Sequence, residues 1–462
     1  MTHLTIALDR VDFLPPDRVT DNAAILTLKA HVFEPLVRWR DGRIEPALFA
    51  AWESDAAGRD WQFRLRDGAR FHDGAPCTGA DVVAFLTAIL DSRDMFGMRW
   101  SYARYFAGAQ MTATPAGVRF ACPAPFADLP EVLSEFYIAR RDGAGRAILG
   151  TGAWRVAAFT PGETATLTPI DPAQPTLTFT AMTRAEDRLA ALRAGAIDAA
   201  AGLEQADEPP TETPDLTWLH TVNTLSVMAY LNCTAGAFAD PRARLAANLA
   251  IDRARLIAEV YGGRALAANT VVSPWHTGHA EAGLESLPFD PKRAGALLAT
   301  TDGPREIIIR TPDHMPERAP AIAARIARDL AAVGFQPRIE CIADRPGYAR
   351  AIAAKDMGDL AIFDSSPHVT FRVLDDKISS ATQALWWQGF ADAETEALFA
   401  TARACRDPAR AAAYGRVLAR LNAAPPWLYL VHPVALAAQR PGTFPLTLDA
   451  KGVLSPLPRT LP

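Results

Sequence analysis

The sequence predicts an α/β protein of two or three domains, and three observations lead to this prediction. The chain has 462 residues, which is more than one compact core usually holds. Between residues 306 and 364, strand-like and helix-like segments alternate at the spacing of βαβ units, which indicates a mostly parallel sheet. Residues 61–85 place a strand, two tight turns and a helix start in one run.

The chain opens with a predicted strand and helix. LTIALDR has the composition of a short strand, and residues 20–39 have helical spacing with Thr20 or Asp21 as the N-cap. The run WQFRLRDGARFHDGAPCTGADVVAF then alternates apolar and polar side chains over its first five residues, as a half-buried strand does. Two turns follow, at 67–68 and at 73–76. Thr78 and Asp81 form a capping pair for a helix at 81–90.

The later elements follow from the same signals. The pattern of residues 154–168 predicts a hairpin around Thr160-Pro161-Gly162. The helix that follows is expected to end near Gly195. Residues 201–215 are polar and proline-rich, which favours a surface loop. In the second half we predict a strand at 224–232 and one helix at 241–263. Strands at 306–311, 336–342 and 359–364 then alternate with helices at 318–334 and 347–356. One helical stretch at 391–421 and a buried strand at 425–438 complete the chain.

Composition and charge exclude several classes of protein. The net charge is −5 and Lys plus Arg number 47, so neither nucleic acid nor an anionic membrane should attract the chain in general. The sequence contains no run of about 18 apolar residues, so a membrane-spanning segment is not expected. The first ten residues have neither the basic region nor the apolar region that an export signal requires. The chain has either lost such a signal and gained Met1, or begins natively in the cytoplasm. The five cysteines show no C-x-x-C spacing, which favours reduced thiols and leaves one disulfide open.

Motifs for catalysis and metal binding are missing. The patterns G-x-S-x-G, G-x-x-x-x-G-K-[ST], H-E-x-x-H and a strand-linked G-x-G-x-x-G do not occur. His276 and His279 could share a metal, but no acidic or thiol residue lies at ligand spacing, so an exposed loop is the favoured interpretation. We therefore predict no catalytic residue, no resident metal and no cofactor.

Six cassettes together resemble one family. Beside the segment 61–85, these are HVFEPLVRWRDGRIEPALFAAWE, GTGAWRV, RLAALRAGAID, NLAIDRARLIAEVYGGRA and FDPKRAGALL. In order and spacing they resemble the extracytoplasmic solute-binding proteins of family 5, the peptide, nickel and opine type that serves ABC importers. Within the signature segment, Arg66, Phe71, His72 and Asp73 are expected to be scaffold. Glu34, in the first of the other cassettes, is expected to be a buried hydrogen-bonding group or a helix-end charge rather than a ligand contact.

The resemblance implies a bilobal periplasmic-binding-protein fold, type II, of the large peptide-binding cluster, with two hinge crossovers. Apolar strands at 224–232 and 427–432 are the expected crossings, which assigns residues 1–228 and 430–462 to lobe I, with an extra subdomain at roughly 35–150, and residues 229–429 to lobe II. The implied function is capture of a short peptide, an opine or another zwitterion in the interlobe cleft, followed by delivery to a membrane permease. A periplasmic monomer is expected. The alternative is a cytoplasmic ligand sensor or an enzyme on the same fold.

The ligand contacts are expected where the chain departs from its family. Peptide-binding members carry a Trp and then an Asp after a strand of the second lobe, whereas here Phe363 takes the aromatic place and Ser366 the place of the carboxylate. Asp364 could replace that carboxylate and select a cationic group, or it could be a helix or turn cap. Ser365 lies between these two residues.

Further candidates surround that stretch, each with a structural alternative. Arg372 could bind a ligand carboxylate or form a surface ion pair, and His368 could donate a hydrogen bond or simply occupy a polar loop. Trp386 and Trp387 would face opposite ways on a strand, so at most one of them should stack on a ligand. Polar or aromatic contacts are also expected from Asn223, Thr224, Asp21, Asn22 and Tyr105, although Tyr105 could instead pack on a helix face.

Overall fold

A computed structural model describes residues 2–14, 22–91, 93, 101–208, 210–284, 286–314 and 316–457. The chain divides into two compact units, unit 1 (Met1–Thr221 with Ala435–Pro462) and unit 2 (Val222–Val434). The chain thus passes between units at 221/222 and again at 434/435, whereas the sequence placed the passages at 228/229 and 429/430. The difference arises because strand β15 (Ser226–Leu231) pairs along its whole length with a strand of unit 2.

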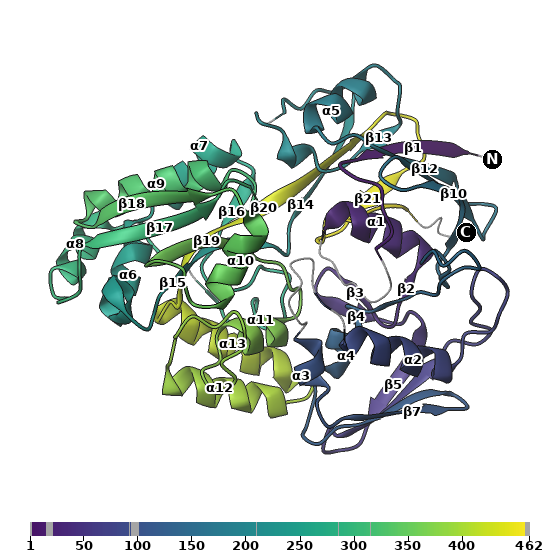
Figure 1. The fold of residues 1–462 in the computed structure, drawn as a ribbon, viewed down its shortest axis with the longest axis horizontal. Helices are drawn as coiled ribbons and strands as arrows, with labels where there is room; N and C mark the ends of the chain where they lie inside the picture. Colours follow the sequence, from purple (N-terminus) through teal and green to yellow (C-terminus); the bar gives the residue numbers. More distant parts are fainter. Residues whose placement is uncertain are drawn as a thin grey trace. The chain divides into compact units, whose positions relative to one another are not determined.

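Unit 1 is built on a mixed sheet (Figure 1). Strand β1 (His3–Leu8) lies parallel to β12 (Thr176–Ala181) and β13 (Ala199–Ala200), and the predicted hairpin, β10 (Trp154–Thr160) and β11 (Thr164–Pro169), continues the sheet from β12. The other elements of this part are α1 (Ala23–Val32), α5 (Ala185–Arg193), a 3-10 turn (Leu203–Gln205), β14 (Thr217–Val222), β21 (Leu446–Leu448) and β22 (Leu454–Pro456).

A second sheet lies in the region where the sequence suggested an extra subdomain, and it belongs to unit 1. Its four antiparallel strands follow the order β5, β6, β8, β7, and helix α2 packs on β7 and β8. The capping box predicted for α2 is present, because Thr78 and Asp81 each accept from the other's backbone. The elements here are β2 (Glu34–Pro35), β3 (Arg38–Arg40), β4 (Arg43–Glu45), β5 (Phe49–Ser54), β6 (Asp60–Leu65), α2 (Gly79–Leu90), α3 (Tyr102–Tyr105), β7 (Gln110–Thr114), β8 (Gly117–Ala121), α4 (Leu129–Leu133) and β9 (Tyr137–Ile138).

Three of the cassettes meet in a polar clasp within unit 1. The Arg66 guanidinium donates to both carboxylate oxygens of Glu34 at 3.0–3.2 Å, and the Thr151 hydroxyl donates to the same carboxylate at 3.0 Å. A ring nitrogen of His72 lies 3.0 Å from the carbonyl oxygen of Gly152. The clasp joins the segments around residues 34, 66–72 and 150–152, so these motif residues are scaffold, as predicted.

Unit 2 holds a five-strand sheet in the order β18, β17, β19, β15, β20, with β16 also on β20. Strands β17, β18 and β19 are parallel and the rest antiparallel, so the mostly parallel sheet expected from the sequence is instead mixed. Helices α6 to α9 cover one face with an apolar core, and α10 and α13 contact the other face through Tyr348 and Tyr429. Figure 1 shows α12 and α13 side by side.

The bounds of the unit 2 elements, in chain order, complete the fold. They are β15 (Ser226–Leu231), a 3-10 turn (Gly236–Ala239), α6 (Pro241–Ala250), α7 (Arg253–Tyr261), β16 (Ala265–Ala267), α8 (Pro291–Leu298), β17 (Glu306–Pro312), α9 (Ala319–Ala332), β18 (Gln336–Ile342), α10 (Arg345–Ala353), β19 (Leu360–Ser365), α11 (Thr370–Lys377), α12 (Ala393–Ala404), α13 (Ala409–Ala423) and β20 (Trp427–Gln439), whose end enters unit 1.

Three helices end earlier than the sequence suggested. Helix α1 stops at Val32, because Glu34 precedes a proline and adopts an extended backbone in β2. The helix expected at 241–263 is two helices, since the Asp252 side chain caps a new one by accepting from Arg255 N at 2.9 Å. The stretch at 391–421 is divided in the same way, with Pro408 at the start of α13.

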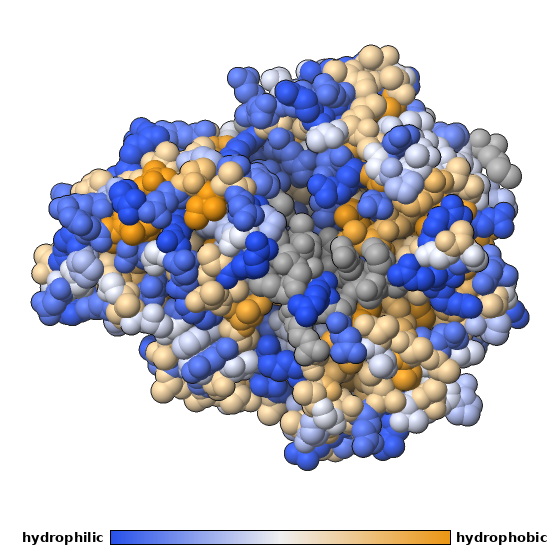
Figure 2. Space-filling view, in the orientation of Figure 1, coloured by the Kyte–Doolittle hydropathy of each residue, from blue (hydrophilic) through white to orange (hydrophobic). Residues whose placement is uncertain are grey.

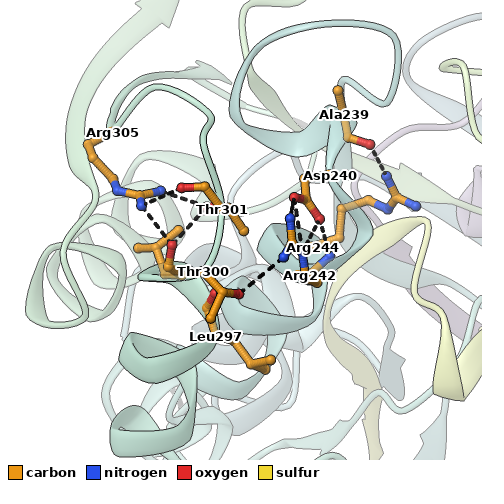
Figure 3. Close-up of polar contacts among 9 residues, drawn as sticks. Ala239, Asp240, Arg242, Arg244, Leu297, Thr300, Thr301 and Arg305 are labelled. Atoms are coloured by element: carbon orange, nitrogen blue, oxygen red, sulfur yellow. Dashed lines mark hydrogen bonds and ion pairs between the residues drawn. The ribbon is translucent and has the colours of Figure 1, made fainter.

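Helices α6 and α8 pack together, and polar contacts fasten their ends (Figure 3). The Arg242 guanidinium donates to the Asp240 carboxylate at 2.6–3.1 Å and lies 3.5 Å from the hydroxyl oxygen of Thr300. Arg305 donates to the Thr301 hydroxyl at 2.8 Å. These arginines are therefore structural in unit 2.

The surface of unit 2 is mixed on the face that Figure 2 shows: polar side chains dominate it, and apolar ones occur in small groups near β17 and β18. In the described part of the chain, no helix combines the length and the apolar character needed to cross a bilayer. All five cysteines are described and none is paired.

Candidate functional site

The carboxyl end of β19 carries the stretch that the sequence analysis singled out. Strand β15 pairs with β19 so that Ser226 lies opposite Ser365, and Val227 lies opposite Asp364. Side chains alternate between the two faces of a strand, so Ser365 shares a face with Phe363, while Asp364 points to the face of the apolar core. Residues 366–369 then lead into α11.

Asp364 is half-buried at the edge of that core. Its backbone carbonyl accepts from Lys377 Nζ at 3.3 Å. Burial raises the pKa of the Tyr230, Tyr261 and Tyr348 hydroxyls, and the negative charge of Asp364 adds to the effect at all three. Helix α11 has Val369 as its N-cap, so Asp364 is not the cap of this helix.

The residues after Asp364 are largely buried. Ser365 is 2% exposed, and its hydroxyl oxygen has no hydrogen-bond partner among the described residues. His368 is buried and Ser366 is half-buried. The carbonyl oxygen of Pro367 lies 2.7 Å from His276 Nε2, so a distant loop holds this stretch in place.

Helix α11 buries a run of charged side chains. The Arg372 side chain is 12% exposed, and its Nε lies 3.7 Å from Asp376 Oδ2, which is itself buried. Asp375 and Lys377 are buried beside it. The ion pair of Arg372 is therefore largely buried, where the sequence suggested a surface pair or a ligand contact.

Aromatic side chains gather around Phe363. Its ring centroid lies 5.5 Å from that of Tyr230, 6.2 Å from Tyr348 and 5.2 Å from Trp386, and the Arg345 guanidinium lies 4.6 Å above the ring. This arrangement combines aromatic contacts with a cation–π contact.

The two neighbouring tryptophans behave differently. Trp386 packs on Phe363, whereas Trp387 donates its indole N–H to the Phe390 carbonyl at 2.6 Å. Residues 381–390 form a loop rather than a strand, so the predicted opposite orientation does not arise from strand alternation.

A polar row continues across β15 and β20. The Asn223 side-chain oxygen accepts from Leu225 N at 2.8 Å, and Thr224 is buried. The Ser226 hydroxyl lies 3.1 Å from His432 Nδ1, and Nε2 of that ring has no partner among the described residues. Burial lowers the pKa of His432 from 6.5 to about 3, and the nearby His276 adds to this effect.

Comparison with known proteins identifies the family. The model of the bacterial extracellular solute-binding proteins, family 5, matches residues 43–370, which is more than half of the chain. The chain belongs to this family. Among curated relatives, it is 25% identical to the nickel-binding periplasmic protein of Escherichia coli over 304 residues, which cover 58% of this chain and 55% of the relative. It is also 25% identical to di/tripeptide-binding protein 2 of Pseudomonas aeruginosa over 242 residues, which cover 50% and 44%. The chain spans about half the length of the curated relatives it matches.

Solved structures share the fold over 98–99% of this chain. HbpA2 from Haemophilus parasuis has a TM-score of 0.81 at 18% identity and covers 99% of this chain and 100% of its own. NikA from Brucella suis, in complex with Fe(III)-EDTA, has 0.79 at 22%, covering 99% and 100%. The binding protein AgaA, in complex with agropinic acid, from A. tumefaciens R10 has 0.77 at 20%, covering 98% and 95%. The predicted α/β fold of the periplasmic-binding-protein type is confirmed.

The candidates of this family 5 protein that fall in unit 1 are placed as follows. Asn22 is half-buried and caps α1, since its side-chain oxygen accepts from Ile25 N at 3.1 Å. The N-cap is therefore not one of the two residues proposed from sequence, Thr20 and Asp21, which lie outside the described residues. Tyr105 packs edge-on against Tyr102 with the Arg104 guanidinium 5.1 Å from its ring, which is the helix-face alternative.

Sequence reasoning missed several residues that surround the β19 end. Arg345 and Tyr230 join it through ring contacts, and they lie 18 and 133 positions from Phe363, beyond the reach of any local pattern. His276 was assigned to an exposed loop, but it is 4% exposed. The burial of Asp375, Asp376 and Lys377 in α11 had no local signal, because a run of adjacent charges usually marks a solvated face. Among the described residues, no group of His, Cys, Asp and Glu is arranged to hold a metal ion.

Proposed function

We propose that this protein is the solute-binding component of an ABC importer, which captures a small polar ligand outside the cytoplasm and delivers it to a membrane permease. Membership of family 5 over residues 43–370 supports this role, as do relatives named for binding nickel and di- or tripeptides in the periplasm. The protein would act as a monomer that binds passively and catalyses no reaction.

The ligand-contacting part of unit 2 in this proposal is the carboxyl end of β19 with the loop after it, residues 364–372, together with Trp386. One observation supports it above all: buried polar side chains concentrate there, and the Ser365 hydroxyl has no partner among the described residues. Buried polar groups are nearly always satisfied, so an unsatisfied one at the end of a strand indicates a place for a water molecule or a ligand atom. Asn223 and Thr224 flank the same end of the sheet, next to Ser226, which pairs with Ser365.

The charges on this end favour a ligand that carries both signs. Asp364 supplies a carboxylate for an ammonium or guanidinium group, and Arg345, whose guanidinium lies over the Phe363 ring, supplies one for a carboxylate. Trp386 and Phe363 add an apolar wall. An opine, a short peptide or another zwitterion satisfies all three features. Binding would act by population shift, because a ligand changes the fraction of molecules in one conformation only if it binds that conformation more tightly than the other.

A thermal-shift screen tests the role and the ligand class together. Its compounds are trialanine, agropinic acid, Fe(III)-EDTA and Ni²⁺ with L-histidine, each added to the purified chain. A compound that binds only the folded state raises the unfolding midpoint by mass action, and at a hundredfold excess over Kd the stabilisation is about 2.7 kcal/mol. We expect a shift with trialanine or agropinic acid. Chemical turnover of a bound compound would refute passive binding.

A further inference from the structure

The loop from Ser273 to His279 in unit 2 is tied to the proposed ligand segment at two points. The His276 ring lies in the protein interior, with Nε2 2.7 Å from the carbonyl oxygen of Pro367 and Nδ1 3.0 Å from the Ser273 hydroxyl. The Thr370 hydroxyl donates to the Thr277 carbonyl at 2.7 Å. The two contacts fall on Pro367, in the stretch between β19 and α11, and on Thr370, the first residue of α11.

The hydrogen-bond network fixes which atom of His276 donates. A carbonyl oxygen can only accept, so Nε2 carries the proton that Pro367 accepts. In the neutral ring Nδ1 is then an acceptor, and the Ser273 hydroxyl donates to it. The hydrogen bonds to Pro367 and to Ser273, which is fully buried, therefore hold the ring from both sides.

The same loop is anchored elsewhere in unit 2. The Trp275 indole N–H donates to the carbonyl of Val222 at 2.6 Å, and Val222 is the first residue of unit 2 along the chain. Gly278 has a positive φ of 92° and lies against α13 so closely that a Cβ there would be 2.5 Å from Tyr414 Cβ. The loop is therefore a fixed support and not a free surface loop.

We propose that His276 is a positioning residue for ligand binding: it holds Pro367–Thr370 where the neighbouring side chains can meet the ligand. Residues 366–369 belong to neither a strand nor a helix, so no ladder of backbone hydrogen bonds sets their place. The bond from His276 and the bond from Thr370 replace such a ladder. The inference rests on the proposed ligand role of residues 364–372.

Hydrogen exchange of the ligand-free protein tests the positioning by itself. The variants are H276L, which removes the donor, H276Q, whose amide N–H can replace Nε2–H, and H279L as the matched control, because His279 lies in the same loop. We expect H276L to speed exchange of the amides of Ser366 and of residues 368–372 by about tenfold, the effect of losing one buried hydrogen bond. H276Q should restore slow exchange and H279L should leave it unchanged. Unchanged exchange in H276L would overturn the inference.

Calorimetric titration with trialanine and with agropinic acid then measures the effect on affinity. We expect H276L to weaken the binding of whichever compound the wild type binds by about tenfold, H276Q to recover most of it, and H279L to match the wild type. A merely structural loss would not be rescued in both exchange and affinity by the glutamine. If exchange rises in H276L while affinity stays at the wild-type value, the proposed ligand segment is wrong although His276 still orders it.

Discussion

The clasp in unit 1 and the carboxyl end of β19 in unit 2 are both polar and largely buried, but their side chains are satisfied to different degrees. In the clasp, Arg66, Glu34 and Thr151 form hydrogen bonds with one another, and each of the three belongs to a different family cassette. At the β19 end, the Ser365 hydroxyl and, two strands away on β20, His432 Nε2 have no partner among the described residues. The clasp thus completes its own hydrogen bonds, whereas the β19 end, the ligand segment that we propose, leaves some unmade among the described residues.

The largest effect should come from breaking the close approach under the clasp. Gly150 lies so near α1 that a Cβ would be 1.9 Å from the carbonyl oxygen of Val32. G150A should therefore force a backbone shift and lower the free energy of unfolding by about 3 kcal/mol, measured by thermal and urea unfolding. G143A is the matched control, since nothing lies within 4 Å of its Cβ position. Equal midpoints for the two variants would contradict the packing described for the clasp.

Removing the carboxylate of the clasp should cost somewhat less. E34L leaves the guanidinium of Arg66 without its bidentate partner, and the Glu34 side chain is only 12% exposed. Because Arg66 itself is about one-third exposed, water compensates in part, and we expect a loss of about 2 kcal/mol.

The control for this change is E45L, because Glu45 forms an exposed pair with Arg40 at 3.8 Å and such pairs contribute little. The double variant E34L/R66M should regain part of the stability that E34L loses. Ligand affinity should stay unchanged in every variant that remains folded, since the clasp is scaffold.

The elements that sequence reasoning recovered are those whose signals are local. The capping pair Thr78 and Asp81, the hairpin around Pro161 and the alternation from β17 to β19 each depend on neighbours in the chain, and all three are present. The break before Asp252 was missed because an apolar helical pattern runs through it, and only the cap interrupts it.

The candidate site was harder to predict, for a physical reason. The sequence could point to Asp364 because a strand pattern ends there, but the residues that surround it come from β15, α10 and α11. These contacts depend on which helices pack on each face of the sheet, and the spacing of residues along the chain does not predict that packing. His276 was misjudged for the same reason: its partner Pro367 lies 91 residues away.

The unsatisfied histidine at the end of the sheet predicts acid sensitivity. Burial lowers the pKa of His432 to about 3, while the unfolded chain should titrate near 6.5. Below pH 6.5 the unfolded state therefore binds the proton first, and the stability that is fully present above 6.5 is lost as pH falls towards 3. At about 1.4 kcal/mol per pH unit, the loss reaches about 2 kcal/mol by pH 5.

The measurement is the dependence of the unfolding free energy on pH between 7 and 5 for the wild type and H432N. Asparagine keeps a polar group near Ser226 but cannot take up the proton, so its slope should be flatter. His31 in unit 1 has a pKa lowered by burial to about 4 and serves as the comparison, since it should contribute a similar slope that H432N leaves in place. Parallel curves for H432N and the wild type would show that His432 does not titrate on unfolding.

The smallest change in stability, together with the clearest change in binding, is expected at Asp364. Its carboxylate is half-buried and lies near buried tyrosine hydroxyls whose pKa it helps to raise, so D364A should alter the free energy of unfolding by less than about 1 kcal/mol. If Asp364 receives the cationic group of the ligand, the same variant should weaken trialanine or agropinic acid binding at least tenfold, because a charge-assisted hydrogen bond is lost. D356A provides the matched control, an exposed aspartate of unit 2 that pairs with Arg310. Wild-type affinity in D364A would place the ligand's cation elsewhere, and a large loss of stability would mean that this end of β19 is closed scaffold like the clasp.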